Sequence, residues 1–218
     1  MLMEKERNEI VEYGKKLVTE HLTKGTGGNI SIYDPEQGTM AISPSGIDYF
    51  DTKPEDVVVM KLDGTIVEGN RKPSSEHDLH IALYEKKPDV RAVVHTHSMF
   101  CTVLGVNNMD LKAVHYVLAD AGTPSVPLAP YVTYGTRELA DAVANTIGDS
   151  YACLMKNHGM IACGKNVASA FSLASNCEWV AEIQWRCLCC GTPNILSDAE
   201  MAKVLHKFQS YGQAPEKK

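Results

Sequence analysis

The 218-residue sequence has no apolar run near the roughly 20 residues that a helix needs to cross a bilayer. Its first residues, MLMEKERNEIVEYGKK, are charged and lack the apolar centre of an export signal. Internal repeats and low-complexity linkers are also missing. These absences predict a protein of the cytoplasm that makes no use of a membrane.

The seven cysteines lack the arrangement of a structural metal site. Cys187, Cys189 and Cys190 lie close together, but no second pair follows to complete four sulfur ligands. Their odd number and the missing export signal predict free thiols in a reducing compartment.

Basic residues are in the minority, with 21 lysines and arginines against 27 acids and a formal net charge of -6. Nucleic-acid affinity comes largely from basic side chains on phosphates, so a nucleic-acid partner is not expected. Hydrophobic residues make up 44% and charged residues 22%, which is ordinary for a globular protein. The length fits one large domain, predicted over residues 1–211, with a flexible tail at 212–218.

Helical and strand patterns alternate along the chain. The predicted helices are 4–22, 74–85, 136–147, 166–190 and 198–209, and the predicted strands are 29–33, 39–42, 56–62, 90–95, 126–128, 151–155 and 160–163. The hairpins and the strand at 56–62 have no helical crossovers between them. This predicts an α/β fold with a mixed, mainly antiparallel sheet and helices on both faces.

Three histidines carry the clearest chemical signal. His95 and His97 are two residues apart at the end of a predicted strand, so their side chains point to one face. His158 stands between Asn157 and Gly159 at the tip of a predicted hairpin, where a plain turn residue would also fit. Three imidazoles on one metal leave a coordination position open for water or substrate. We therefore predict one divalent ion, zinc by preference, at these histidines.

A serine-rich segment precedes the helix predicted at 74–85. Ser75 and Asp78 have the spacing of a capping box, which predicts a helix N-terminus here. Free N–H groups at such an end, with the hydroxyls of Ser74 and Ser75, also suit an anion.

Three further polar residues follow in the same segment. Glu76 is placed to reach a metal or to act as a base. We expect His77 and His80 at the surface or at an interface rather than on the metal.

Two loops rich in small residues could approach a phosphate. GTGGN at 25–29 follows a helix and precedes a strand, which is the reverse of a dinucleotide-binding fingerprint. SPSG at 43–46 follows a strand. Backbone N–H groups in such loops can bind phosphate, although each loop alone is more typical of an ordinary turn.

Taken together, these motifs resemble the class II aldolase/adducin family. The resemblance covers nearly the whole chain and includes, in order, GTGGN at 25–29, SPSG at 43–46, KPSSE at 72–76, AVVHTH at 92–97, AVHY at 113–116, APYVTYGTREL at 129–139, NHGMIAC at 157–163 and KFQSYG at 207–212. Several motifs in one order are far more specific than any one of them.

The resemblance implies a three-layer α/β/α subunit and a homotetramer with active sites at subunit interfaces. It implies one zinc ion per subunit on His95, His97 and His158, with Glu76 as a fourth ligand or as the acid/base. It also implies a catalytic Tyr116 from the neighbouring subunit, a Tyr134 that lines the pocket and a catalytic Tyr211 on the C-terminal tail.

The phosphate-binding positions are implied in the same way: Thr26, Gly28, Asn29, Ser45, Gly46, Ser74 and Ser75. Ser45 departs from the threonine of the aldolases that the chain resembles, but it keeps the hydroxyl.

The implied reaction is reversible cleavage of L-fuculose 1-phosphate, or a related ketose 1-phosphate, to dihydroxyacetone phosphate and L-lactaldehyde. A Lewis-acid metal can stabilise the enediolate that this reaction needs. Alternatives are an enzyme for 5-deoxyribulose or methylthioribulose 1-phosphate, an L-ribulose-5-phosphate 4-epimerase, and a non-catalytic adducin-like module. The epimerase motif His-Ala-Asp is absent from 114–117, which reads VHYV, and the complete histidine set argues against the module.

Overall fold

A computed structural model describes residues 1–208 and centres on an eight-stranded sheet. The strand order is β4 (Ile66–Glu68), β3 (Val58–Lys61), β2 (Thr39–Ile42), β1 (Asn29–Asp34), β5 (Ala92–Thr96), β10 (Gly159–Gly164), β9 (Ala152–Met155) and β8 (Leu128–Ala129). Every neighbouring pair is antiparallel except β8 and β9. The predicted mixed, mainly antiparallel sheet is confirmed.

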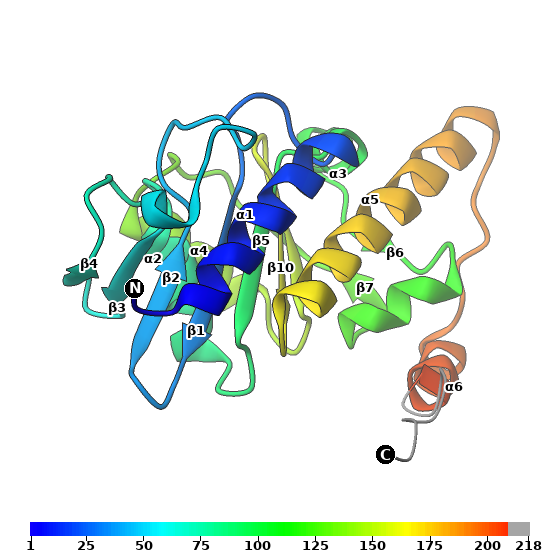
Figure 1. Ribbon diagram of the computed structural model, residues 1–218. Coiled ribbons are helices and arrows are strands. Elements are labelled where there is room, and N and C mark those ends of the chain that lie inside the picture. Colours follow the sequence, from blue (N-terminus) through cyan, green and yellow to red (C-terminus); the bar gives the residue numbers. More distant parts are fainter. Residues whose placement is uncertain (209–218) are drawn as a thin grey trace, which may run out of the picture.

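Helices cover both faces of this sheet, which gives the three layers that the resemblance implied (Figure 1). One face carries α1 (Glu4–Thr19), α3 (Met99–Val106) and α5 (Val167–Cys190). The other face carries α2 (His77–Lys86) and α4 (Arg137–Thr146). The last helix, α6 (Asp198–Phe208), packs beside the 3-10 helix η2 (Tyr116–Ala121).

The central strands are buried on both faces, which explains why most of their residues are apolar. Along β5, Ala92 and Val94 enter the core under α1 and α5, whereas Val93 enters the core under α2 and α4. Successive side chains on a strand point to opposite faces, so a strand between two helical layers buries residues in both layers and favours apolar ones at most positions.

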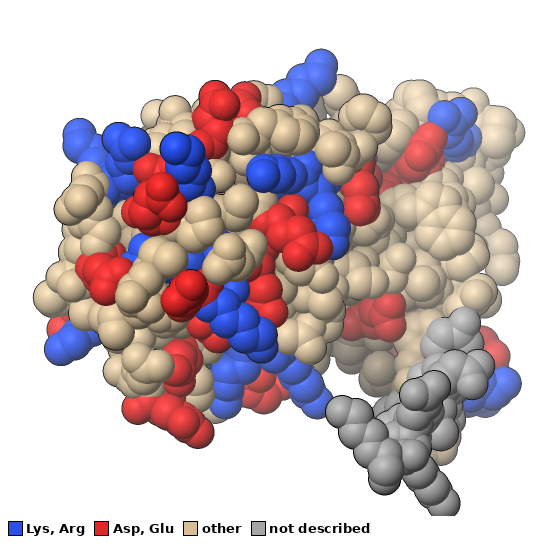
Figure 2. All heavy atoms as spheres, viewed as in Figure 1, with Lys and Arg blue, Asp and Glu red and all other residues tan. Residues whose placement is uncertain are grey.

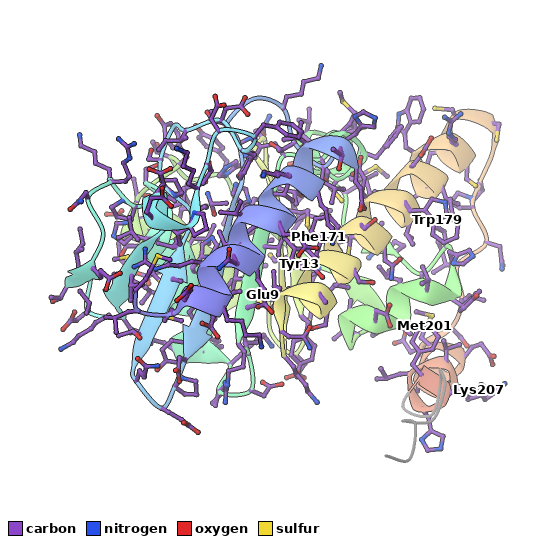
Figure 3. All side chains as sticks on the ribbon, in the orientation of Figure 1. Glu9, Tyr13, Phe171, Trp179, Met201 and Lys207 are labelled. Carbon is purple, nitrogen blue, oxygen red and sulfur yellow. The ribbon has the colours of Figure 1, made fainter. Side chains whose placement is uncertain are left out.

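The visible surface is divided by its charge. In Figure 2, basic and acidic side chains are interspersed over the half that contains α1, while they are sparser over α5. Trp179 and Trp185 of α5 are exposed, and Trp179 is labelled on this side in Figure 3. This part of α5 therefore offers apolar and aromatic surface.

The long helix α5 begins at a residue that the sequence marks. Asn166 accepts a hydrogen bond from the backbone N–H of Ser169, whose side chain bonds back to Asn166, forming a capping box. One turn further, Phe171 meets Tyr13 of α1 edge to face, with ring centroids 5.2 Å apart (Figure 3). This contact fixes α1 against α5 over the sheet.

Short elements differ from the prediction. The helix α3 was missed because its sequence, MFCTVLGV, is apolar nearly all round and shows no helical period. The strand expected at 126–128 is two strands, because Pro127 cannot donate to a ladder. Before Pro127, β7 (Ser125–Val126) pairs with β6 (Leu111–Lys112). After Pro127, β8 pairs with β9 and so joins the large sheet.

Two expectations about the chain as a whole can be compared with residues 1–208. None of their helices combines the length and apolar character required to traverse a bilayer. All seven cysteines are free thiols, as predicted.

Gly28 supplies a test of how the glycine loop fits the sheet. It has φ +73°, and a Cβ there would lie 2.6 Å from the backbone oxygen of His95. Gly38 has φ +65°, but nothing lies within 4 Å of its Cβ position. Gly38→Ala should therefore cost only backbone strain of about 1–2 kcal/mol. Gly28→Ala should lower the free energy of unfolding by about 1–3 kcal/mol more than Gly38→Ala does, because the β1–β5 contact must open.

Urea unfolding of both variants measures this difference in the free energy of unfolding. Equal losses would show that the loop yields without disturbing β5.

Candidate metal centre

Strand pairing brings the three histidines together. His95 is buried on β5, and His97 follows the end of that strand by one residue. His158 lies in the turn between β9 and β10, and β10 pairs with β5 so that Ile161 is opposite His95. The turn therefore falls beside the end of β5, so that His158 can share one ion with His95 and His97, which lie about 60 residues earlier in the sequence.

The turn that carries His158 depends on two small features. Asn157 has φ 54°, the left-handed conformation that asparagine tolerates better than most residues. Gly159 has a different use: a Cβ there would collide with the backbone oxygen of Thr96 and lie 3.2 Å from the His97 ring. The left-handed backbone angle of this turn is therefore at Asn157, whereas Gly159 permits the close approach to Thr96 and His97.

Glu76 reaches the histidines from the turn just before α2. The helix α2 begins at His77, so the predicted start at residue 74 and the Ser75–Asp78 capping box are wrong. The reason is that the preceding segment is extended: the backbone N–H of Ser74 donates to the Ser43 oxygen at 3.0 Å. This pairing leaves Glu76 in the residue position before the helix, aimed at the histidine cluster.

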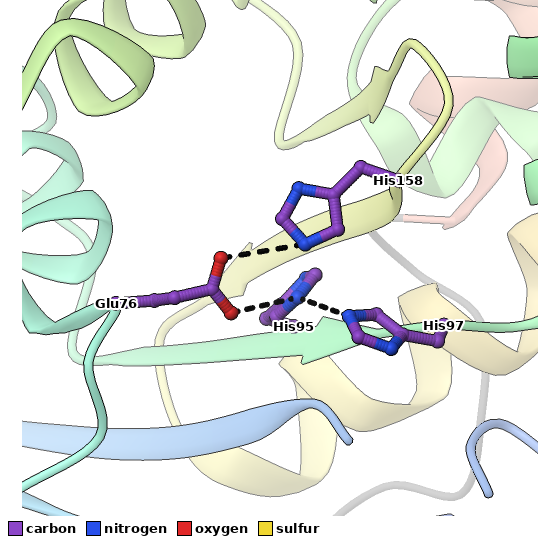
Figure 4. A group of neighbouring side chains, drawn as sticks. All are labelled: Glu76, His95, His97 and His158. Atoms are coloured by element: carbon purple, nitrogen blue, oxygen red, sulfur yellow. Dashed lines mark hydrogen bonds and ion pairs between the residues drawn. The ribbon is translucent and has the colours of Figure 1, made fainter. Parts of the chain in front are cut away.

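The four side chains form one compact set of ligand atoms (Figure 4). Each contributes one nitrogen or oxygen, and these atoms all lie within 4.8 Å of one another. Glu76 Oε2 is 3.2 Å from His95 Nε2, and Glu76 Oε1 is 3.3 Å from His158 Nε2. His97 Nε2 is 3.0 Å from His95 Nε2.

Two observations show that this set suits a cation. His95 Nδ1 is 2.9 Å from the Met160 carbonyl, which can only accept, so Nδ1 carries the proton and Nε2 presents its lone pair to the cluster. Glu76 Oε1 is buried and has no hydrogen-bond donor among residues 1–208. A divalent ion would satisfy both groups at once.

Charge states at neutral pH agree with this donor set. Burial opposes ionisation of Glu76, but His95 and then His158 outweigh it and hold the pKa of the carboxyl well below its usual range. Burial lowers the pKa of His158 to about 4, from 6.5 for an ordinary histidine. The cluster therefore combines a carboxylate with neutral imidazole, the forms that bind metal.

A cavity of about 260 Å³ opens on the cluster. Its lining comprises Glu76, His97, Tyr131, Val132, Tyr134, Asn157 and His158. Tyr134 thus lines the pocket with the metal-type ligands, where the resemblance placed it. A larger cavity, about 640 Å³, lies beside the start of α5, and none of the four cluster residues lines it.

The loops predicted to bind phosphate converge next to this cavity. Loop 43–46 and loop 72–75 run side by side, joined by a Pro44–Pro73 bridge and by the Ser45 N–H to the Lys72 oxygen at 3.0 Å. Tyr49 donates to the Gly28 oxygen at 2.8 Å and so ties the glycine loop to the same group.

The exposure of the predicted phosphate ligands differs among them. Thr26, Ser45, Gly46 and Ser75 are exposed, Gly28 is half-buried, and Asn29 and Ser74 are buried. The Asn29 amide donates to Glu76 Oε2 at 3.1 Å, so its side chain is engaged by the cluster.

One predicted catalytic tyrosine, Tyr116, is not brought to the cluster within the described part of the chain. Tyr116 is exposed on η2, beside His115 and Phe208, and lines a separate cavity. Tyr211 lies outside the described residues.

The two other histidines of this segment differ from each other. His77 is half-buried at the start of α2. His80 is wholly buried, so the expectation of a surface or interface position is wrong for this residue.

Comparison with known proteins agrees with this geometry. Residues 8–185 match the family described as the Class II Aldolase and Adducin N-terminal domain. A 5-deoxy-D-ribulose 1-phosphate aldolase of Bacillus thuringiensis serovar kurstaki is 50% identical, over 98% of this chain and 100% of its own. An L-fuculose phosphate aldolase of Escherichia coli strain K12 is 41% identical, over 88% of each chain.

A solved structure of L-fuculose 1-phosphate aldolase superposes with a TM-score of 0.92 and 42% identity, covering 94% of this chain and 96% of that one. The chain belongs to the class II aldolase and adducin family. With its histidine–glutamate cluster, it is a class II aldolase, a metal-dependent aldehyde-lyase.

Metal content tests the ligand set directly. His95→Ala, His97→Ala and His158→Ala should each reduce bound zinc from about one ion per chain to a small fraction, because a three-histidine site loses a third of its nitrogen donors. His77→Ala is the matched control, since its ring lies 3.0 Å from the Ser74 oxygen and outside the cluster. Elemental analysis after dialysis against zinc gives the stoichiometry, and a histidine whose variant keeps a full complement is not a ligand.

Proposed function

We propose that this class II aldolase reversibly cleaves a ketose 1-phosphate to dihydroxyacetone phosphate and a short aldehyde that ends in a methyl group. The observation that carries the proposal is the juxtaposition of the histidine–glutamate cluster with the converging loops 25–29, 43–46 and 72–75. A metal-type site beside anion-binding loops suits a substrate that has a carbonyl near its phosphate.

In this proposal His95, His97 and His158 hold one zinc ion, with Glu76 as a fourth ligand or as the acid/base. When bound, the ion supplies a Lewis acid that stabilises negative charge on the substrate carbonyl oxygen. The Nδ1–H tautomer of His95 supports the assignment, because its Nε2 is left free as a donor.

Glu76 is the proposed proton carrier at the reacting carbon. In synthesis, its carboxylate removes a proton from the hydroxyl-bearing carbon next to the carbonyl of dihydroxyacetone phosphate. In cleavage, the bond between the third and fourth carbons breaks, and the carboxylic acid returns that proton to the third carbon. The position of Glu76 supports this role, because its Oε1 is buried in the cluster and has no hydrogen-bond donor among residues 1–208.

The loops around the cavity are proposed to fix the phosphate. Serine hydroxyls and backbone N–H groups at positions 26–29, 45–46 and 74–75 would orient the substrate relative to Glu76. Positioning of this kind supplies a substantial part of a catalytic rate.

Tyr116 is proposed to act across a subunit interface in a homotetramer. It would take the proton from the hydroxyl of the fourth carbon during cleavage and return it to the aldehyde oxygen during synthesis. Its exposure and its distance from the cluster's cavity within one chain support a role in a neighbouring active site. The exposed Trp179 beside His115 extends the same aromatic surface.

Two ketose 1-phosphates are favoured by particular relatives. The relative that is 50% identical is named for 5-deoxy-D-ribulose 1-phosphate. Relatives and a superposable structure at 41–42% identity are named for L-fuculose phosphate. Higher identity over the full length supports 5-deoxy-D-ribulose 1-phosphate as the first candidate substrate, with L-fuculose 1-phosphate as the second.

Product analysis separates these substrates. Both should yield dihydroxyacetone phosphate, but the deoxyribulose phosphate should release acetaldehyde and the fuculose phosphate lactaldehyde, with the higher kcat/KM for the first. Chelation should abolish either reaction and zinc should restore it, because the cluster then regains its ion. Isomerisation of L-ribulose 5-phosphate without cleavage would identify an epimerase instead, and full activity in metal-free protein would contradict the metal role.

Glu76→Gln tests the proton carrier. The amide keeps the size of the carboxyl group, so the fold should persist. Hydrogen exchange at dihydroxyacetone phosphate in D₂O should fall by about 100-fold or more, because general-base catalysis is lost. Nuclear magnetic resonance of the triose phosphate follows the exchange, and Glu85→Gln, an exposed carboxyl on α2, serves as the control. Unchanged exchange in Glu76→Gln would place the base elsewhere.

A further inference from the structure

A row of buried polar side chains leads from the interior of the α2 layer to Glu76. His80 and Tyr84 are one turn apart on α2, while Asn29 and Ser31 are two residues apart on β1. Both spacings place each pair on one face, and these two faces pack together. Their contacts run in sequence: Tyr84 to Ser31, Ser31 to His80, His80 to Asn29.

The Glu76 carboxylate sets the direction of every hydrogen bond in this row. The Asn29 amide presents its NH₂ to Glu76 Oε2, at 3.1 Å, because a carboxylate oxygen accepts the hydrogen bond. The Asn29 oxygen then faces His80 Nε2, which must carry a proton.

The far half of the row follows from that tautomer. Burial lowers the pKa of His80 to about 3, so the ring is neutral and holds one proton, on Nε2. Its Nδ1 therefore accepts from the Ser31 hydroxyl at 2.7 Å. The Tyr84 hydroxyl, 2.6 Å from Ser31, completes the row as a donor.

This arrangement leaves the two oxygens of Glu76 unequal. Oε2 receives the Asn29 N–H, whereas Oε1 has no hydrogen-bond donor among the described residues and lies 3.3 Å from His158 Nε2. An amide can rotate by half a turn and would then present its oxygen to the carboxylate. The His80 N–H opposes that rotation, because it bonds only to the amide oxygen.

We propose that His80 is a positioning residue that, through Asn29, keeps Glu76 anchored by Oε2 and free at Oε1 for its work in the cluster. His80 touches neither the substrate nor the cluster atoms, and its effect rests on the proposed role of Glu76. Without the His80 N–H, the Asn29 amide would sample both orientations. In a fraction of the molecules its oxygen would then face Glu76, and the hydrogen bond to Oε2 would be lost.

Three variants distinguish positioning from general support of the fold. His80→Leu removes both hydrogen bonds at similar volume, whereas His80→Gln keeps an N–H where the ring Nε2–H lies. Leu83→Ala, on the same helix and equally buried, destabilises the core without touching the row. We expect kcat to fall about tenfold or more in His80→Leu, with KM nearly unchanged. In His80→Gln, kcat should recover to near the wild-type value. Leu83→Ala should lower the free energy of unfolding while kcat stays near the wild-type value.

A second measurement does not depend on activity. In the zinc-loaded protein with ¹⁵N-labelled histidine, the resonances absent from the His80→Gln spectrum belong to His80. They should show a neutral ring protonated at Nε2. A proton on Nδ1, or a folded His80→Leu protein with wild-type kcat, overturns the proposal. If His80→Leu does not fold, the tautomer and the His80→Gln kinetics decide between the two outcomes.

Failure of the proposed function is distinguishable from failure of this inference. A wild-type enzyme that cleaves no ketose 1-phosphate contradicts the function, while an Nε2–H tautomer in the same sample still supports the hydrogen-bonded row. A wild-type enzyme that cleaves the substrate, with His80→Leu equally fast, refutes only the row.

Discussion

The register between β5 and β10 is the constraint on which the site depends. With Ile161 opposite His95, the turn between β9 and β10 delivers His158 to the end of β5. A slip of one residue would turn every side chain of β10 to the opposite face. The two cores prevent that slip, because Met160 and Ile161 are buried in different layers. The same strand register is thus required both for packing of the interior and for bringing the candidate metal ligands together.

Local periodicity was sufficient for much of the fold. The central strands are mostly apolar, and the helices α1, α4 and α5 have clear periods or caps, so their positions follow from residues that are close together in the chain. The His95–His97 pair can be predicted in the same way, because two residues that are two positions apart on a strand point to the same face. What could not be derived locally is the meeting of that pair with His158 and Glu76. There the resemblance of motifs supplied the grouping, and the structure places the four side chains together.

The start of α2 shows where local reasoning fails. Ser75 and Asp78 have the spacing of a cap, but the pairing of Ser74 with Ser43 keeps Ser74 out of the helix, which begins only after the turn at Ser75 and Glu76. A contact between loops thirty residues apart outweighs a capping bond of about 1 kcal/mol. His80 was misplaced for a related reason, because a polar residue on a helix was assigned to solvent. The signal that could have corrected this is the pair of matching spacings, Asn29 with Ser31 on a strand and His80 with Tyr84 on a helix.

Both tryptophans of the chain, Trp179 and Trp185, lie on the outer side of α5 and are 48% and 38% exposed. Neither belongs to the buried cores beneath the helices. The intrinsic fluorescence of the protein is therefore a property of its surface. Emission will shift toward the blue when another polypeptide covers α5, and it will respond weakly to loosening of the interior. Tryptophan fluorescence is usually used to follow unfolding, but for this chain it should instead report whether another polypeptide binds to α5.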